Sequence, residues 1–265
     1  MYQYKITNKN NRELGGLFIF IEESLKEIIE KIPFKDEIGY AGYKSKKWLK
    51  NTLNNFGVDG KNTEFLNKNK NEIKKIVEES LNKCEDFFDD VIYIFIFPSS
   101  DNFIKEKMGG VNGFTPWKKT ILIFINPIEN WKESLKNIII HEIVHTITRY
   151  YGANSYTLGE SFIHEGIAEN FKEDLLKKRA SWTEAINKKE SIRIFREIRQ
   201  LLNKENDYKM HNELFFGIGK YPNWTGYTIG YYLVKEYLSK KFRDDRINWK
   251  GVFKIKPQEI LNNWL

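Results

Sequence analysis

His141, Glu142 and His145 form an H-E-x-x-H pentapeptide inside an apolar run that begins at Ile138. On an α-helix, positions i and i+4 share a face, so both imidazoles can reach one metal ion. Glu142 then points toward the metal-bound water, where it can serve as a general base. The chain has only four histidines, so chance alone seldom produces this spacing around a glutamate. The pattern predicts a zinc-dependent peptidase.

A catalytic zinc needs a third protein ligand, with its fourth position left for water. Residues 146–151 lack the glycine and histidine that a metzincin site would require. Glu165 and His164 are the downstream candidates, and neighbouring helix positions point about 100° apart, so they cannot face the metal equally. Residues 146–164 leave room for a loop and a second helix that could bring either residue to the metal. The small Gly166 and Ala168 are expected to let the two helices approach closely.

Glu169 lies four residues after Glu165 and therefore on the same helix face. A carboxylate there could accept the outer N–H of His141 or His145 and so fix the tautomer and orientation of that ring. An ordinary surface glutamate on a charged helix is the alternative.

The elements expected to position these residues are mostly helical. Helices are predicted over residues 17–32, 44–56, 64–88, 132–150, 160–178, 183–202 and 227–240. Two β-rich runs, 91–97 and 120–126, each end before a proline, and the glycine-rich residues 109–114 between them predict a flexible turn. The pattern predicts an α+β fold, predominantly helical, with a helical N-terminal lobe (1–88) and a catalytic lobe containing a small sheet (89–265).

The composition is that of a folded globular protein: 41% of the 265 residues are hydrophobic and 15% are aromatic. The net charge of +7 comes from lysines interleaved with glutamates, as in residues 68–75, which favours solvated helix faces over a nucleic-acid surface. Cys84 is the only cysteine, which excludes an intrachain disulfide and a multi-cysteine zinc site. The polar N-terminus predicts no secretory signal, and the longest apolar run, 91–97, is far shorter than the ~20 residues of a membrane span. We therefore expect a cytoplasmic protein.

The H-E-x-x-H motif, followed by Glu165-Gly-x-Ala, resembles the gluzincin clan of zinc metallopeptidases. Residues 162–171 look like the helix that carries the clan's third ligand. The chain resembles most closely a bacterial family of predicted Zn-dependent proteases, through these helices and residues 222–232. The similarity covers about residues 109–240. It implies a zincin-like lobe in which His141, His145 and Glu165 bind Zn²⁺ and Glu142 activates water.

The same resemblance implies how substrate would bind. Residues 121–126 match the clan's edge strand upstream of the active helix, so Ile123 and Phe124 are expected to pair with the backbone of a peptide or protein substrate. Clan aminopeptidases hold the substrate amine with a glutamate in the glycine-rich segment, and residues 109–113 have no acid. An endopeptidase is therefore favoured. Gluzincins often place Asp where Glu169 stands, which leaves its contact with a histidine open.

A further donor is expected to stabilise the oxyanion. Tyr227 is the candidate, because it follows Gly226 at an expected helix start, from which a hydroxyl can reach into a cleft. Tyr231, one turn later, is the alternative, and no spacing argument supports His211.

Two other functions compete with a peptidase. A non-catalytic zinc-binding module on the same scaffold is disfavoured by Glu142, since a structural zinc needs no base beside its ligands. A nucleic-acid-binding protein is suggested by the pI near 9.1, but the basic runs 118–119, 177–179 and 240–243 are short.

Overall fold

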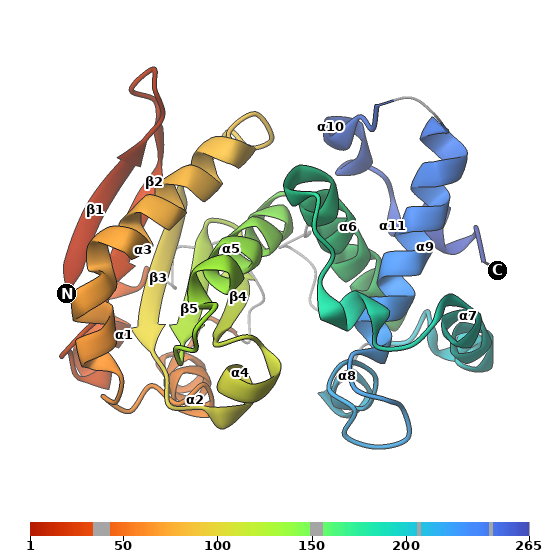
Figure 1. The fold of residues 1–265 in the computed structure, drawn as a ribbon. Helices are drawn as coiled ribbons and strands as arrows, with labels where there is room; N and C mark the ends of the chain where they lie inside the picture. Colours follow the sequence, from red (N-terminus) through yellow and green to blue (C-terminus); the bar gives the residue numbers. More distant parts are fainter. Residues whose placement is uncertain (34–42, 149–155, 206–207, 244–245, 265) are drawn as a thin grey trace. The chain divides into compact units, whose positions relative to one another are not determined.

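A five-stranded mixed sheet forms the centre of the first of the two units into which the chain divides, Met1–Gly152 and Ala153–Leu265 (Figure 1). The computed structural model describes residues 1–33, 43–148, 156–205, 208–243 and 246–264. The strands are β1 (Tyr2–Thr7), β2 (Glu13–Ile19), β3 (Ile92–Pro98), β4 (Val111–Trp117) and β5 (Thr120–Ile125). Their order is β1-β2-β3-β5-β4, with β2, β3 and β5 parallel and β1 and β4 antiparallel to their neighbours.

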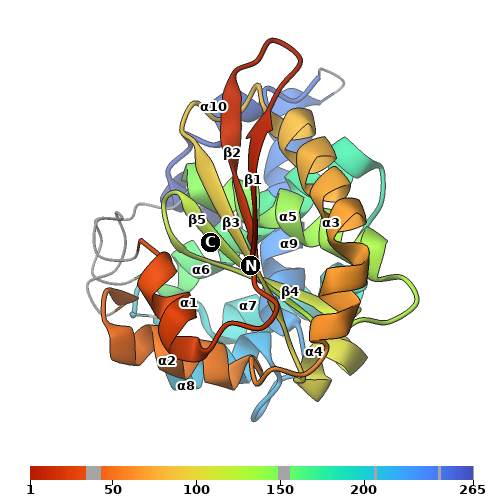
Figure 2. The ribbon, with the colours of Figure 1, turned by 90° about the vertical axis from the view of Figure 1, so that its left-hand side faces the viewer.

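Helices cover both faces of this sheet. One face, with Leu122 and Phe124 of β5, builds an aromatic-rich core with α1 (Leu25–Lys31) and α2 (Lys46–Asn55). Alternation along β5 turns its isoleucines to the other face, along which α3 (Thr63–Cys84) and α5 (Trp131–Thr148) run (Figure 2). The short α4 (Asn102–Lys107) precedes β4. The expected α+β fold with a small sheet is confirmed.

The second half of α5 has no polar face, which is typical of a helix segment buried on all sides. Its residues from Ile138 to Thr146 are all buried. At its start, the ring of Trp131 packs edge-on against Phe65 of α3, with 5.1 Å between ring centroids. These contacts fix the helix that carries the H-E-x-x-H pentapeptide.

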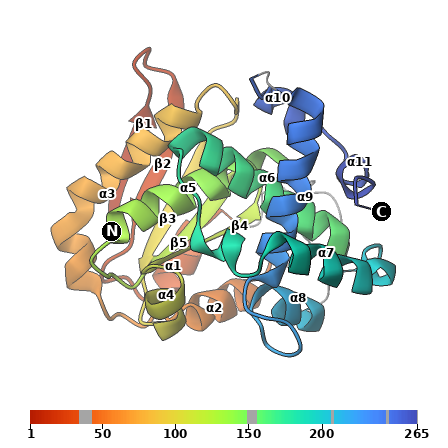
Figure 3. The same ribbon diagram turned by 45° about the vertical axis from the view of Figure 1, so that its right-hand side comes forward.

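The second unit is helical. Its elements are α6 (Leu158–Leu176), α7 (Lys188–Glu197), α8 (Tyr208–Phe215), α9 (Thr225–Phe242), α10 (Trp249–Val252), α11 (Pro257–Leu261) and 3-10 turns at Ser181–Glu184 and Arg199–Leu201. α6 and α9 lie side by side (Figure 3). Asn170 joins them, because its Nδ2 donates to the backbone oxygens of Gly166 and Tyr231. The single helix expected over 183–202 is broken into α7 and two 3-10 turns.

The expectation of a helical N-terminal lobe was wrong. Residues 2–7 and 13–19 are strands, and the predicted helix 17–32 is reduced to α1, which starts at a capping box of Ser24 and Glu27. β2 pairs in parallel with β3, so one sheet runs across the expected boundary at residue 88. The division between the two units lies at residue 152 instead.

Two expectations for residues 109–126 were also wrong. The predicted flexible turn is largely β4. The predicted edge strand is β5, which pairs with β3 on one side and β4 on the other. Ile123 and Phe124 are fully buried, because each faces one of the helix-covered sides of the sheet. Among the described residues, β1 and β4 are the two edge strands of the sheet, and β4 is the one beside β5.

Within the described ranges, none of the helices combines the length and the apolar character that crossing a membrane would require.

Candidate metal centre

α5 brings His141 and His145 together as the pentapeptide predicts. Their Nε2 atoms lie 3.0 Å apart, the rings are nearly perpendicular, and both side chains are buried. Nitrogen ligands bind zinc at about 2.0–2.1 Å, so two of them in a tetrahedral shell are roughly 3.3–3.4 Å apart. The spacing in the structure is close to this value, and the pair fits a single zinc ion.

The carboxylate of Glu142 is held by β4. The hydroxyl of Thr115 donates to Oε2 of Glu142 at 2.7 Å. The backbone oxygen of Glu142 lies 3.2 Å from the same hydroxyl. Gly113, two residues earlier, lies directly against this side chain: a Cβ at Gly113 would be 2.6 Å from Cγ of Glu142 and 3.0 Å from its Oε1. Glu142 is therefore buried and fixed beside the two histidines of its own helix.

α6 positions Glu165 and His164. Its start is fixed by a capping box, in which Thr157 Oγ1 accepts from the backbone N–H of Glu160 and Glu160 Oε2 accepts from that of Thr157. Glu165 and His164 are both buried. The ring of His164 packs against Tyr156, with 4.9 Å between centroids.

His141, His145 and Glu165, all buried, make up a group of donors that could hold a metal ion. Two imidazoles and one carboxylate are a donor set of catalytic zinc sites, which keep a fourth position for water. Both the types of these three residues and the spacing of the two histidines therefore fit zinc.

Glu169 is not a surface glutamate. It is 1% exposed and forms an ion pair of 2.6 Å with the equally buried Lys172 one turn later. The ammonium of Lys172 also lies over the ring of Trp182, 4.7 Å from its centroid. A contact of Glu169 with a zinc-binding histidine stays a prediction.

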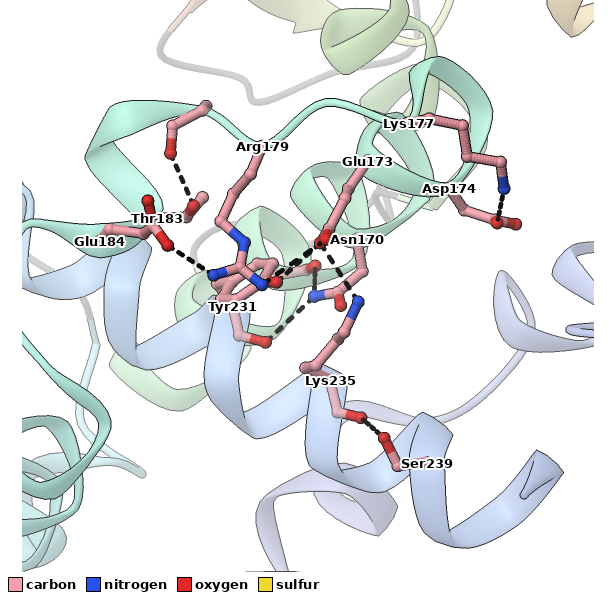
Figure 4. A network of polar contacts seen from close by, with 12 residues as sticks. Asn170, Glu173, Asp174, Lys177, Arg179, Thr183, Glu184, Tyr231, Lys235 and Ser239 are labelled. Carbon is pink, nitrogen blue, oxygen red and sulfur yellow. Dashed lines mark hydrogen bonds and ion pairs between the residues drawn. The ribbon is translucent and has the colours of Figure 1, made fainter. Parts of the chain in front are cut away.

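Tyr231 belongs to a polar network of α6 and α9 (Figure 4). Its hydroxyl donates to Glu173 at 2.6 Å, Lys235 lies 3.2 Å from the same carboxylate oxygen, and the guanidinium of Arg179 covers the ring at 5.0 Å. Burial, followed by the bond to the Glu173 carboxylate, raises the pKa of Tyr231. This engagement argues against the alternative in which Tyr231 stabilises an oxyanion.

Tyr227 has a different environment. Its half-buried ring packs edge-on against Phe215 and Trp224, with centroid distances of 5.2 and 5.7 Å. His211 of α8 stacks on Phe215 at 4.5 Å. The role of Tyr227 as an oxyanion donor stays a prediction.

Thr115 and Gly113 were not predicted from the sequence as residues of the site. Gly113 lies in the segment 109–114, which was interpreted as a turn because of its glycines, and Thr115 directly follows that segment. The β-branched and aromatic residues of 111–117 were the available signal for a strand, and alternation would have placed Gly113 and Thr115 on one face.

The comparisons with known proteins agree with this chemistry. A family model described as Predicted Zn-dependent protease (DUF2268) matches residues 70–262. No curated protein and no solved structure matches the chain.

Proposed function

Because the chain belongs to this family of predicted Zn-dependent proteases, we propose that it hydrolyses peptide bonds, with zinc held by His141, His145 and Glu165. The observation that carries the proposal is the convergence of His141 Nε2 and His145 Nε2 to 3.0 Å beside a buried glutamate. A structural zinc site would not require this glutamate, Glu142, beside its ligands.

The chain supplies a proton carrier at Glu142. A zinc ion held by His141, His145 and Glu165 would polarise the attacking water and lower its pKa toward ~7. Glu142 takes the proton of this water as it attacks the peptide carbonyl and then delivers the proton to the leaving amine. Glu142 is buried and bonded to Thr115, so its carboxylate would stay within reach of both the water oxygen and the leaving amine nitrogen. Little reorganisation is then needed between the two proton transfers.

Tyr227 is our candidate for the hydroxyl that stabilises the oxyanion. The packing of its ring between Phe215 and Trp224 restricts the directions its hydroxyl can take. A preorganised donor of this kind acts mainly on the transition state.

The substrate is an extended peptide or protein segment, paired with β4. An edge strand offers backbone groups to an added strand, and β5 is excluded because both of its sides are paired. An endopeptidase is favoured over an aminopeptidase, since residues 109–113 carry no acid that could hold a free amine.

A peptide-library assay on zinc-loaded protein tests this function. We expect cleavage inside peptides by the wild type, and loss of at least about a thousandfold in Glu142→Gln, which keeps the size and the zinc ligands. Wild-type rates in Glu142→Gln would contradict the assignment of the base. A wild-type protein that holds about one zinc per chain and cleaves nothing would favour the non-catalytic zinc module.

A further inference from the structure

A β-bulge interrupts β4 next to Glu142. Phe114 pairs with Leu122 and Trp117 pairs with Thr120, so two residues of β4, Thr115 and Pro116, lie opposite one residue of β5. A bulge of this kind bends the strand and changes the direction of a side chain. Pro116, which has no N–H to donate, is compatible with an edge strand at this point.

The side chain at this bulge is the one that holds Glu142. Thr115 is 1% exposed, and its hydroxyl lies 2.7 Å from Oε2 of Glu142 and 3.2 Å from the Glu142 backbone oxygen. A hydroxyl has one hydrogen, and the shorter contact, to a carboxylate, is the stronger bond. Thr115 therefore ties Oε2 to β4.

The glycine on the same strand determines how close the carboxylate lies. A Cβ at Gly113 would come within 2.5 Å of Ile138 Cγ2 and 2.6 Å of Glu142 Cγ, distances that real contacts do not allow. Only a glycine lets β4 approach α5 here. Gly113 makes room for the Glu142 side chain, and Thr115 fixes its rotation.

We propose that Thr115 is a positioning residue for Glu142, holding Oε2 so that Oε1 is the oxygen that takes the proton of water. The inference rests on the proposed function, in which Glu142 is the general base. It makes the edge strand β4 a part of the catalytic machinery as well as the expected place of substrate pairing.

Two substitutions at Thr115 separate positioning from packing. Thr115→Val keeps the shape of the side chain and removes the hydroxyl. We expect kcat to fall by about 10- to 100-fold, because a misdirected Glu142 carboxylate slows the chemical step. KM, zinc content and melting temperature should stay near wild type. Thr115→Ser keeps the hydroxyl and should remain within about threefold of the wild-type kcat.

Thr120→Val is the matched control. Thr120 is a fully buried threonine of the adjoining strand whose hydroxyl has no hydrogen-bond partner among the described residues. Its loss should leave kcat unchanged.

Three outcomes overturn the inference. Wild-type kcat in Thr115→Val, or an equal fall in Thr115→Val and Thr115→Ser, removes the hydroxyl from the mechanism. A fall in kcat that only follows loss of zinc or of the folded state shows a structural role. If the wild type cleaves peptides, any of these three outcomes leaves the proposed peptidase function intact. A wild type that cleaves no peptide removes both the proposed function and the role of Thr115.

Discussion

Gly166 of α6 and Gly230 of α9 face each other in direct backbone contact. A Cβ at Gly166 would lie 2.1 Å from the carbonyl oxygen of Gly230, and a Cβ at Gly230 would lie 2.1 Å from that of Phe162. Neither position has room for a methyl group. Gly166 was expected to let its helix approach the H-E-x-x-H helix, and the structure shows that it serves the packing of α6 on α9.

Gly166→Ala should therefore destabilise the protein and displace the neighbouring Glu165. Overpacking costs about 1–3 kcal/mol, and more when backbone atoms must move. A loss of this size lowers the melting temperature of a chain of this length by roughly 2–12 °C. We also expect weaker zinc binding, measured by competition with a chelator.

Gly251→Ala is the control for this prediction. The atoms nearest to a Cβ at Gly251 belong to the Asn248 side chain, at 3.2 Å and beyond, and a side chain can move aside. A melting temperature of Gly166→Ala no lower than that of Gly251→Ala would contradict the packing of the two helices.

Lys172→Met should be strongly destabilising. Lys172→Met removes the ammonium that faces the buried Glu169 carboxylate, and the loss of one partner of a buried ion pair costs about 3–5 kcal/mol. Thermal unfolding should show a melting temperature lower by roughly 10 °C. The double variant Lys172→Met/Glu169→Gln should recover part of this loss. If the double variant is as unstable as the sum of the single ones, the two side chains are not coupled.

Cys84 should be unreactive in the native protein. Burial raises the pKa of its thiol from 9.0 to about 12, and the thiolate is the reactive form. Three pKa units correspond to about a thousandfold less thiolate at pH 8. An aromatic disulfide reagent should modify one thiol per chain in urea and almost none without it. Rapid modification of the folded protein would contradict the burial of Cys84.

Tyr227→Phe and Tyr231→Phe should have opposite signatures. Removing an oxyanion donor typically lowers kcat by about 10²–10³, so Tyr227→Phe should keep its stability and lose turnover. Tyr231→Phe removes the donor to Glu173 and should lower the melting temperature with kcat near wild type. Full kcat in Tyr227→Phe would exclude this tyrosine from the mechanism.

Local patterns predicted the parts of the site that lie on single helices. The i, i+4 spacing of His141 and His145 brings two nitrogens together on any α-helix, and the structure has them 3.0 Å apart. The helix containing Glu165 was also expected, and its capping box at Thr157 and Glu160 is a sequence signal in its own right.

Long-range pairing was what the sequence did not reveal. Whether 121–126 is an edge or an interior strand depends on which segments pair with it, and β4 was hidden by its glycines. Gly113 indicated flexibility in the sequence, although in the structure it provides clearance for Glu142. The N-terminal strands were missed in part for the same reason: one partner of β2, the parallel strand β3, lies more than 70 residues away, whereas the other, β1, precedes it in a local hairpin.

Metal content measured by plasma mass spectrometry tests the central claim most directly. Wild type, Glu165→Ala and His164→Ala would be purified identically without added metal. We expect about one zinc per chain in the wild type and in His164→Ala, with zinc lost or much weakened in Glu165→Ala. Full zinc in Glu165→Ala, or no zinc in the wild type even after reconstitution, would contradict a site formed by His141, His145 and Glu165.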